Sequence, residues 1–114
     1  MKAITCLLLI LSVVCFPSGS GTQTVATSGT PVQLYVTNPP TKAVICTITA
    51  QTSNTGVVYV GFTSAVSAAS KSGTPLTAGN SYICQPNANA AFWNLGEFWL
   101  DSTVSGDKVS FSWK

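Results

Sequence analysis

The chain has 114 residues, of which 46% are hydrophobic and only 7% are charged, with five lysines, no arginine, no histidine and three carboxylates. General acid–base catalysis commonly needs a histidine or a tuned carboxylate pair, and a serine or cysteine nucleophile needs a neighbouring base. The composition therefore excludes most common catalytic sites, and we expect a protein that is not an enzyme and that uses no cofactor.

The first twenty residues differ in kind from the rest of the chain. Lys2 precedes an uncharged hydrophobic run over residues 3–16, and a small-residue stretch, Pro-Ser-Gly-Ser, follows it. The run is shorter than the roughly 20 residues that a membrane-spanning helix needs. We expect residues 1–20 to be a signal peptide that is removed before Gly21, with a retained hydrophobic anchor or a buried arm as the alternatives.

Residues 21–114 are then one domain of a secreted, extracellular or virion-surface protein, which would touch a membrane only through residues 1–20 if these are retained. This domain has the length of a single modest hydrophobic core. It holds two cysteines, Cys46 and Cys84, both within strand-like runs. Export would favour a disulfide between them, and the alternative is a pair of small buried hydrophobic residues. Two cysteines without histidine make a poor zinc site, so no metal is expected.

Short runs with β-strand patterns begin at residue 32. Residues 32–36 alternate, and proline stops this run at Pro39. In residues 43–51, Val44, Cys46, Ile48 and Ala50 share one face, although Ile45 breaks the alternation. A turn over residues 52–56 leads into residues 57–62, which we expect to pair with the preceding strand as a hairpin.

The second half of the chain continues the all-β pattern. Residues 63–78 are poor in large side chains and are expected to be a long surface connection, anchored by Val66 and Leu76. Strands are expected at residues 81–84, within the aromatic-rich residues 92–101 and at residues 109–113, with a turn at residues 105–107. Six or seven short strands at this spacing predict an antiparallel β-sandwich of the jelly-roll type.

Five sequence blocks in this order resemble a small family of β-sandwich proteins from tailed-phage virions. The blocks are residues 25–34 (VATSGTPVQL), 54–61 (NTGVVYVG), 73–79 (GTPLTAG), 98–101 (FWLD) and 105–111 (SGDKVSF). The members of that family are capsid decoration proteins and head-fibre domains, so the resemblance implies a sandwich fold and a structural role in a virion. The hydrophobic N-terminal segment is not part of this pattern.

The aromatic side chains of the second half are the candidate interaction residues. Core packing or a subunit interface is the main interpretation, and a flat platform for sugar stacking is the alternative. The residues selected for this role are Trp93, Phe98, Trp99 and Trp113. The three acids, Glu97, Asp101 and Asp107, match no calcium-loop spacing, and a turn-capping aspartate explains Asp107 more simply.

The sparse charge of the chain bears on its partners. A soluble protein usually has about 25% charged residues, whereas here serine, threonine, asparagine and glutamine supply most of the polar surface. Such a surface is easily desolvated at an interface with copies of itself or with a capsid or surface scaffold. Isolated lysines offer little to a nucleic acid. We therefore expect a non-catalytic structural subunit or decoration protein, with a secreted module that binds carbohydrate or a cell surface as the alternative.

Overall fold

The computed structural model describes residues 18–86 and 92–114. In this part of the chain the structure has ten short strands, one 3-10 helix and no α-helix. The elements are β1 (Gly19–Thr24), β2 (Val32–Gln33), β3 (Lys42–Ala43), β4 (Cys46–Ala50), β5 (Val58–Gly61), β6 (Thr74–Leu76), β7 (Ser81–Cys84), β8 (Trp93–Asn94), η1 (Leu95–Glu97), β9 (Trp99–Ser102) and β10 (Lys108–Trp113).

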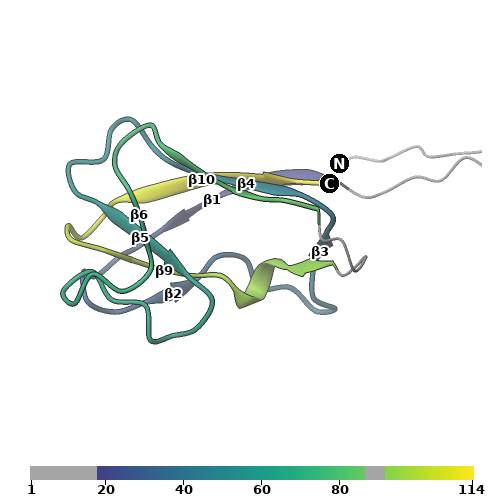
Figure 1. Ribbon diagram of the computed structural model, residues 1–114, viewed down its shortest axis with the longest axis horizontal. Helices are drawn as coiled ribbons and strands as arrows, with labels where there is room; N and C mark the ends of the chain where they lie inside the picture. Colours follow the sequence, from purple (N-terminus) through teal and green to yellow (C-terminus); the bar gives the residue numbers. More distant parts are fainter. Residues whose placement is uncertain (1–17, 87–91) are drawn as a thin grey trace, which may run out of the picture.

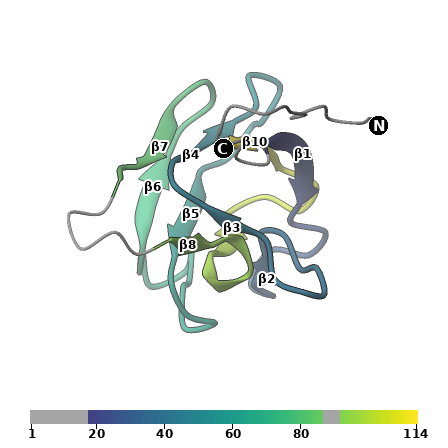
Figure 2. The same ribbon diagram turned by 90° about the vertical axis from the view of Figure 1, so that its right-hand side faces the viewer.

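Two four-stranded antiparallel sheets face each other. Sheet A has the strand order β1-β10-β4-β7, sheet B has the order β2-β9-β5-β6, and β3 and β8 form a separate two-stranded ribbon. Figure 1 shows sheet A as the upper layer and β2, β5 and β9 as the lower layer, and Figure 2 shows the two layers end-on. The prediction of an all-β sandwich is therefore confirmed, with more and shorter strands than the expected six or seven.

The strand pairs are nested along the sequence. β5 pairs with β6, β4 with β7, β3 with β8, β2 with β9 and β1 with β10, so each pair encloses the previous one. Two further pairings, β4 with β10 and β5 with β9, join these nested pairs into the two sheets. The first half of the described chain therefore pairs antiparallel with the second half along its length, and the resulting double-stranded ribbon is rolled into two packed sheets.

Alternation along the strands places one side of each sheet in a common core. In β10, Val109, Phe111 and Trp113 point inward as predicted, and in β4 Cys46, Ile48 and Ala50 do the same. Sheet B and the connecting segments contribute the remaining buried side chains, among them Val58, Val60, Leu76, Leu95, Phe98 and Leu100. The core thus draws on almost every strand, as expected for a domain with a single modest core.

β1 has no apolar side chain and is held by the rings of its neighbour. Gly19 pairs with Trp113, and Gly21 pairs with Phe111. A Cβ atom on Gly19 would lie 2.6 Å from the Trp113 ring, and one on Gly21 would lie 2.8 Å from the Phe111 ring. The two glycines therefore leave the space that the aromatic side chains occupy, which explains why a Gly-Ser-Gly sequence forms a strand here.

The connection between β5 and β6 covers the outer face of sheet B. Val66 and Ala68 are buried in a small second cluster with Tyr59, and Trp99 packs against this cluster. The expected anchors Val66 and Leu76 are both buried. Residues 63–78, which were expected to be only a surface connection, therefore contain β6 near their end and cover the outer face of sheet B.

Two expected local features are corrected. The predicted hairpin between residues 43–51 and 57–62 does not form, because β4 lies in sheet A and β5 crosses to sheet B. The strand expected at residues 32–36 is limited to β2, and Val36 is 65% exposed.

Residues 1–17, most of the expected signal peptide or anchor, lie outside the described residues. Gly19 and Ser20 belong to β1, so a cut before Gly21 would remove the first two residues of that strand.

Candidate interaction surface

The outer face of sheet A carries a regular array of hydroxyl groups. The register across β1, β10, β4 and β7 aligns two rows, namely Ser20, Ser112, Thr47 and Ile83, and Thr22, Ser110, Thr49 and Ser81. We call the seven serine and threonine side chains of these rows the hydroxyl face. They are exposed or half-buried because the opposite side of each strand supplies the core. Neighbouring strands lie about 4.8 Å apart, so the hydroxyl groups are closely and evenly spaced.

The seven side chains of the hydroxyl face are uncharged, and Lys108 lies exposed beside them, one row further along the same side of β10. The face is also slightly hollowed. A shallow depression of about 370 Å³ lies on it, lined mainly by Ser and Thr residues of β1, β4 and β10. The Thr49 and Ser81 hydroxyls are 2.7 Å apart, and Gln51 Nε2 donates to Ser110 Oγ at 3.0 Å. No carboxylate lies among the paired residues of the two rows. The surface can therefore both donate and accept hydrogen bonds, and covering it costs little where the facing surface supplies partners for its hydroxyl groups.

Asp101 is a buried carboxylate that ties two loops to sheet B. Its side chain is 1% exposed. Oδ1 accepts a hydrogen bond from the Gly29 N–H at 2.8 Å, and Oδ2 accepts one from the Ala68 N–H at 2.8 Å. Gly29 lies between β1 and β2, and Ala68 lies between β5 and β6. Both carboxylate oxygens are therefore engaged in holding backbone segments that are far apart in sequence.

Asp107 performs a similar task at the turn between β4 and β5. Its Oδ1 accepts from the Thr55 N–H at 3.2 Å, and its Oδ2 accepts from the Gly56 N–H at 3.0 Å and from the Ser102 hydroxyl at 2.9 Å. The N–H partners belong to the turn at residues 52–56 and not to the turn at residues 105–107 that contains Asp107, so the carboxylate joins two turns that are far apart in sequence instead of capping its own. Glu97 is exposed at the end of η1. Among residues 18–86 and 92–114, no three potential metal ligands gather at one place.

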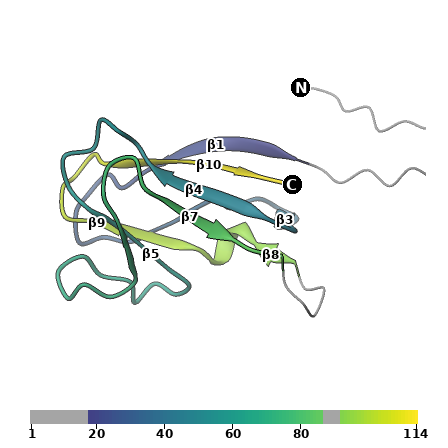
Figure 3. The same cartoon turned by 45° about the horizontal axis from the view of Figure 1, so that its top comes forward.

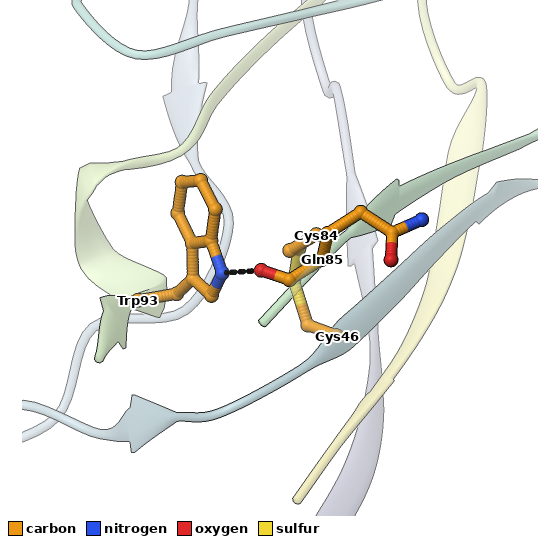
Figure 4. The surroundings of a disulfide bond; sticks show 4 residues. All are labelled: Cys46, Cys84, Gln85 and Trp93. Atoms are coloured by element: carbon orange, nitrogen blue, oxygen red, sulfur yellow. Dashed lines mark hydrogen bonds between the residues drawn. A yellow bond between two sulfur atoms is a disulfide. The ribbon is translucent and has the colours of Figure 1, made fainter. Parts of the chain in front are cut away.

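Cys46 and Cys84 form a disulfide between directly opposed residues of β4 and β7. Their Cα atoms are 4.9 Å apart. Figure 4 shows Trp93 beside this bridge, with its indole Nε1 donating to the Gln85 carbonyl oxygen at 2.6 Å. The predicted cysteine pairing is confirmed, and it fixes the end of β7 to the beginning of β4, an inner strand of sheet A.

Two of the four candidate aromatic residues meet at one end of the sandwich. Phe98 is fully buried, and its ring centroid lies 5.9 Å from that of Trp93. Phe62 stacks on Trp93 at a centroid distance of 6.1 Å and is itself 51% exposed. Phe98 therefore serves the core, whereas Trp93 lies half-buried at the rim.

The other two candidates lie elsewhere. Trp113 stacks with Phe111 and contacts the tilted ring of Tyr35 on the inner side of sheet A. Its indole N–H is buried there and has no hydrogen-bond partner among residues 18–86 and 92–114. Trp99 packs on the outer side of sheet B beneath the β5–β6 connection. The four selected side chains therefore share no single exposed plane. The hydroxyl face was not selected from the sequence, because its residues come from four separate strands.

Comparison with protein-family models, with curated proteins and with solved structures finds no significant match. Within the described part of the chain, no helix has the length and apolar character needed to cross a membrane.

Proposed function

We propose that the chain is a non-catalytic structural subunit that packs against copies of itself, on a virion surface or in an extracellular assembly. The hydroxyl face is the observation that carries this proposal. This exposed and ordered array brings no charge into a contact, and charged residues are depleted at the cores of protein interfaces. Its hydroxyl groups can be buried there where they exchange hydrogen bonds with the facing surface. The 7% charged fraction of the whole chain is consistent with the same use.

The chain topology supports a jelly-roll, which is the fold expected from the sequence. If the β3–β8 ribbon is set aside, the remaining eight strands form four nested pairs that alternate between sheets A and B. Such a rolled-up ribbon of eight antiparallel strands is the connectivity of jelly-rolls, which are common in viral capsid proteins and lectins. The topology supports a structural role but does not by itself define a function.

The use of the carboxylates supports the non-catalytic part of the proposal. General acid–base chemistry requires a group that can reach a substrate. The oxygens of Asp101 and Asp107 are buried and occupied by backbone N–H groups, as described above. These side chains stabilise loop positions, and Glu97 stands apart from them on the surface.

The disulfide supports a location outside the reducing cytoplasm. Disulfides persist mainly in secreted proteins and on cell or virion surfaces. The Cys46–Cys84 bridge is therefore consistent with the secreted, extracellular or virion-surface location proposed from the sequence. The carbohydrate-binding alternative has less support, because Phe98 is buried and Trp93, Trp99 and Trp113 lie in three different places.

Negative-stain microscopy of the native protein tests the proposal. We expect regular particles or filaments, and we expect Ser112→Lys, in the centre of the hydroxyl face, to reduce their number by placing a charge in the contact. Ser64→Lys is the matched control, because Ser64 is exposed in the connection over sheet B. Native protein without any regular assembly, or equal effects of the two lysine variants, would contradict the proposal.

A further inference from the structure

β1 is an edge strand with hydrogen-bonding groups that no described residue uses. The Val25 N–H donates to the Asp107 carbonyl oxygen at 2.9 Å, and the Val25 carbonyl oxygen accepts from the Gly106 N–H at 2.8 Å. Both backbone groups of Val25 therefore face β10. Because this orientation alternates along an antiparallel strand, the backbone groups of Ser20 and Thr22 face away from β10.

Among the described residues, no strand lies on that outer side of β1. Figure 3 shows β1 along the margin of sheet A. The Thr24 N–H is the exception among the outward groups, because the Gln23 side-chain oxygen accepts from it at 2.9 Å. The N–H and carbonyl groups of Ser20 and Thr22 are therefore the part of this edge that is open to another strand.

The other sheet edges carry features that discourage strand pairing. At one edge of sheet B, β6 contains Pro75, which has no N–H to donate. At the other edge, β2 has only two residues, and the Gln33 carbonyl oxygen accepts a hydrogen bond from the Gln23 side chain. In sheet A, β7 has four residues and is followed closely by Pro86. β1 has six residues, and none of them is a proline or a charged residue. It is therefore the least protected edge of the described sandwich.

We infer that β1 pairs with β1 of a second copy of the chain in antiparallel orientation, across a twofold axis at Gly21. Ser20 of one copy would then lie opposite Thr22 of the other, and each such pair would exchange two backbone hydrogen bonds. This inference rests on the assembly role proposed above, and it names the contact through which two copies meet. It also requires that Ser20 is retained, so any cut that removes the hydrophobic N-terminal segment has to lie upstream of β1 rather than before Gly21. Strand addition at a sheet edge is a general mode of protein association.

A second copy fits this edge for two reasons. First, β1 contains no charged residue, so two identical β1 strands meet without like-charge repulsion. Among the residues of β10 that pair with β1, only Lys108 is charged, and it lies opposite Thr24 at the far end of β1. The pairing also joins the two A sheets, so that the rows of the hydroxyl face continue from one copy into the next. Four strands with two rows give each hydroxyl face only about 300 Å², well below the roughly 800 Å² per partner of a standard interface. A joined sheet doubles this area to about 600 Å², which is closer to the standard size but still below it.

Sedimentation equilibrium of the native protein and of two proline variants tests the inference. Thr22→Pro removes a backbone N–H that faces away from β10, and it places the proline ring in the proposed contact. Ile83→Pro is the matched control, because the Ile83 N–H faces away from β4 on the opposite edge of the same sheet. We expect the native protein and Ile83→Pro to form dimers or larger species, and we expect Thr22→Pro to dissociate about tenfold or more readily.

The outcomes separate the two proposals. Assembly of Thr22→Pro equal to that of the native protein would overturn the β1 contact and leave the assembly role in place. Native protein that stays monomeric at every concentration would overturn both. If Thr22→Pro does not fold, as judged by circular dichroism, the register is tested by mixing the Ser20→Cys and Thr22→Cys variants under oxidation.

Mass spectrometry of the linked peptides then locates the bridge. The proposed register places position 20 of one copy opposite position 22 of the other, within the roughly 7 Å between Cα atoms that a disulfide can span, whereas identical positions are farther apart. Links between positions 20 and 22 support the inference. Links confined to identical positions, or no link between these positions, overturn it.

Discussion

Replacement of Asp101 by alanine should destabilise the domain strongly. The carboxylate is 1% exposed, and its two oxygens accept the Gly29 and Ala68 N–H groups at 2.8 Å each. Leaving a buried donor without its acceptor costs about 1–3 kcal/mol, with the higher values for charged partners. Loss of both bonds should therefore lower the free energy of unfolding by about 3–5 kcal/mol, a large share of the roughly 5–15 kcal/mol of a typical domain.

The assay is urea unfolding followed by tryptophan fluorescence, together with a thermal melt. At about 4–8 °C for each kcal/mol in a domain of this size, the Tm of Asp101→Ala should fall by at least about 12 °C. Asp101→Asn keeps one acceptor oxygen and should cost roughly half as much. Glu97→Gln is the control, because Glu97 is exposed, and it should change stability by less than about 0.5 kcal/mol.

The same comparison distinguishes a structural acid from a functional one. A carboxylate that is kept for catalysis or metal binding is often held at some cost in stability, so its removal would leave the domain unchanged or more stable. Equal stability of Asp101→Ala and the native protein would therefore refute the structural assignment of Asp101.

Two further predictions concern the sheets. The double variant Cys46→Ala, Cys84→Ala should lose about 4 kcal/mol of unfolding free energy, because the bridge closes a loop with a sequence separation of 38 residues; an unchanged urea midpoint would argue against a stabilising bridge. Gly21→Val should cost about 1–3 kcal/mol, because its Cβ would lie 2.8 Å from the Phe111 ring, whereas Thr22→Val on the opposite face of β1 should be nearly neutral in the same melt. Equal effects of these two substitutions would show that the ring does not fill the space above Gly21.

Sequence patterns predicted the strands whose side chains alternate. Val109, Phe111 and Trp113 lie on one face of β10, and Cys46, Ile48 and Ala50 lie on one face of β4, because burial of one side of a sheet imposes a period of two. The cysteine pair followed from the same pattern, since both residues occupy strand-like runs. The order of the strands in the two sheets could not be read in this way.

The features that sequence reasoning missed depend on distant partners. β1 has no apolar residue, and its strand forms because Gly19 and Gly21 lie beneath rings from the end of the chain. The false hairpin between β4 and β5 arose because a turn does not specify whether the next strand stays in its sheet or crosses to the other. Likewise, the roles of Asp101 and the hydroxyl face depend on loops and strands that only the fold brings together.

One signal in the sequence could have indicated the role of Asp101. It follows Trp99 by two residues in β9, so both side chains face the same side of the strand. Because Trp99 is large and apolar, that side had to be covered by another part of the chain, and a covered carboxylate requires donors. The connection between β5 and β6 supplies both the cover and one donor, the Ala68 N–H.

The molar mass of the native protein in solution tests the central claim most directly. Light scattering over a hundredfold range of concentration should give a mass above that of a single chain, which is 11.8 kDa for all 114 residues and lower if residues 1–20 are removed, and this mass should rise with concentration. A single species with the mass of one chain at every concentration would contradict the claim that this domain acts by packing against copies of itself.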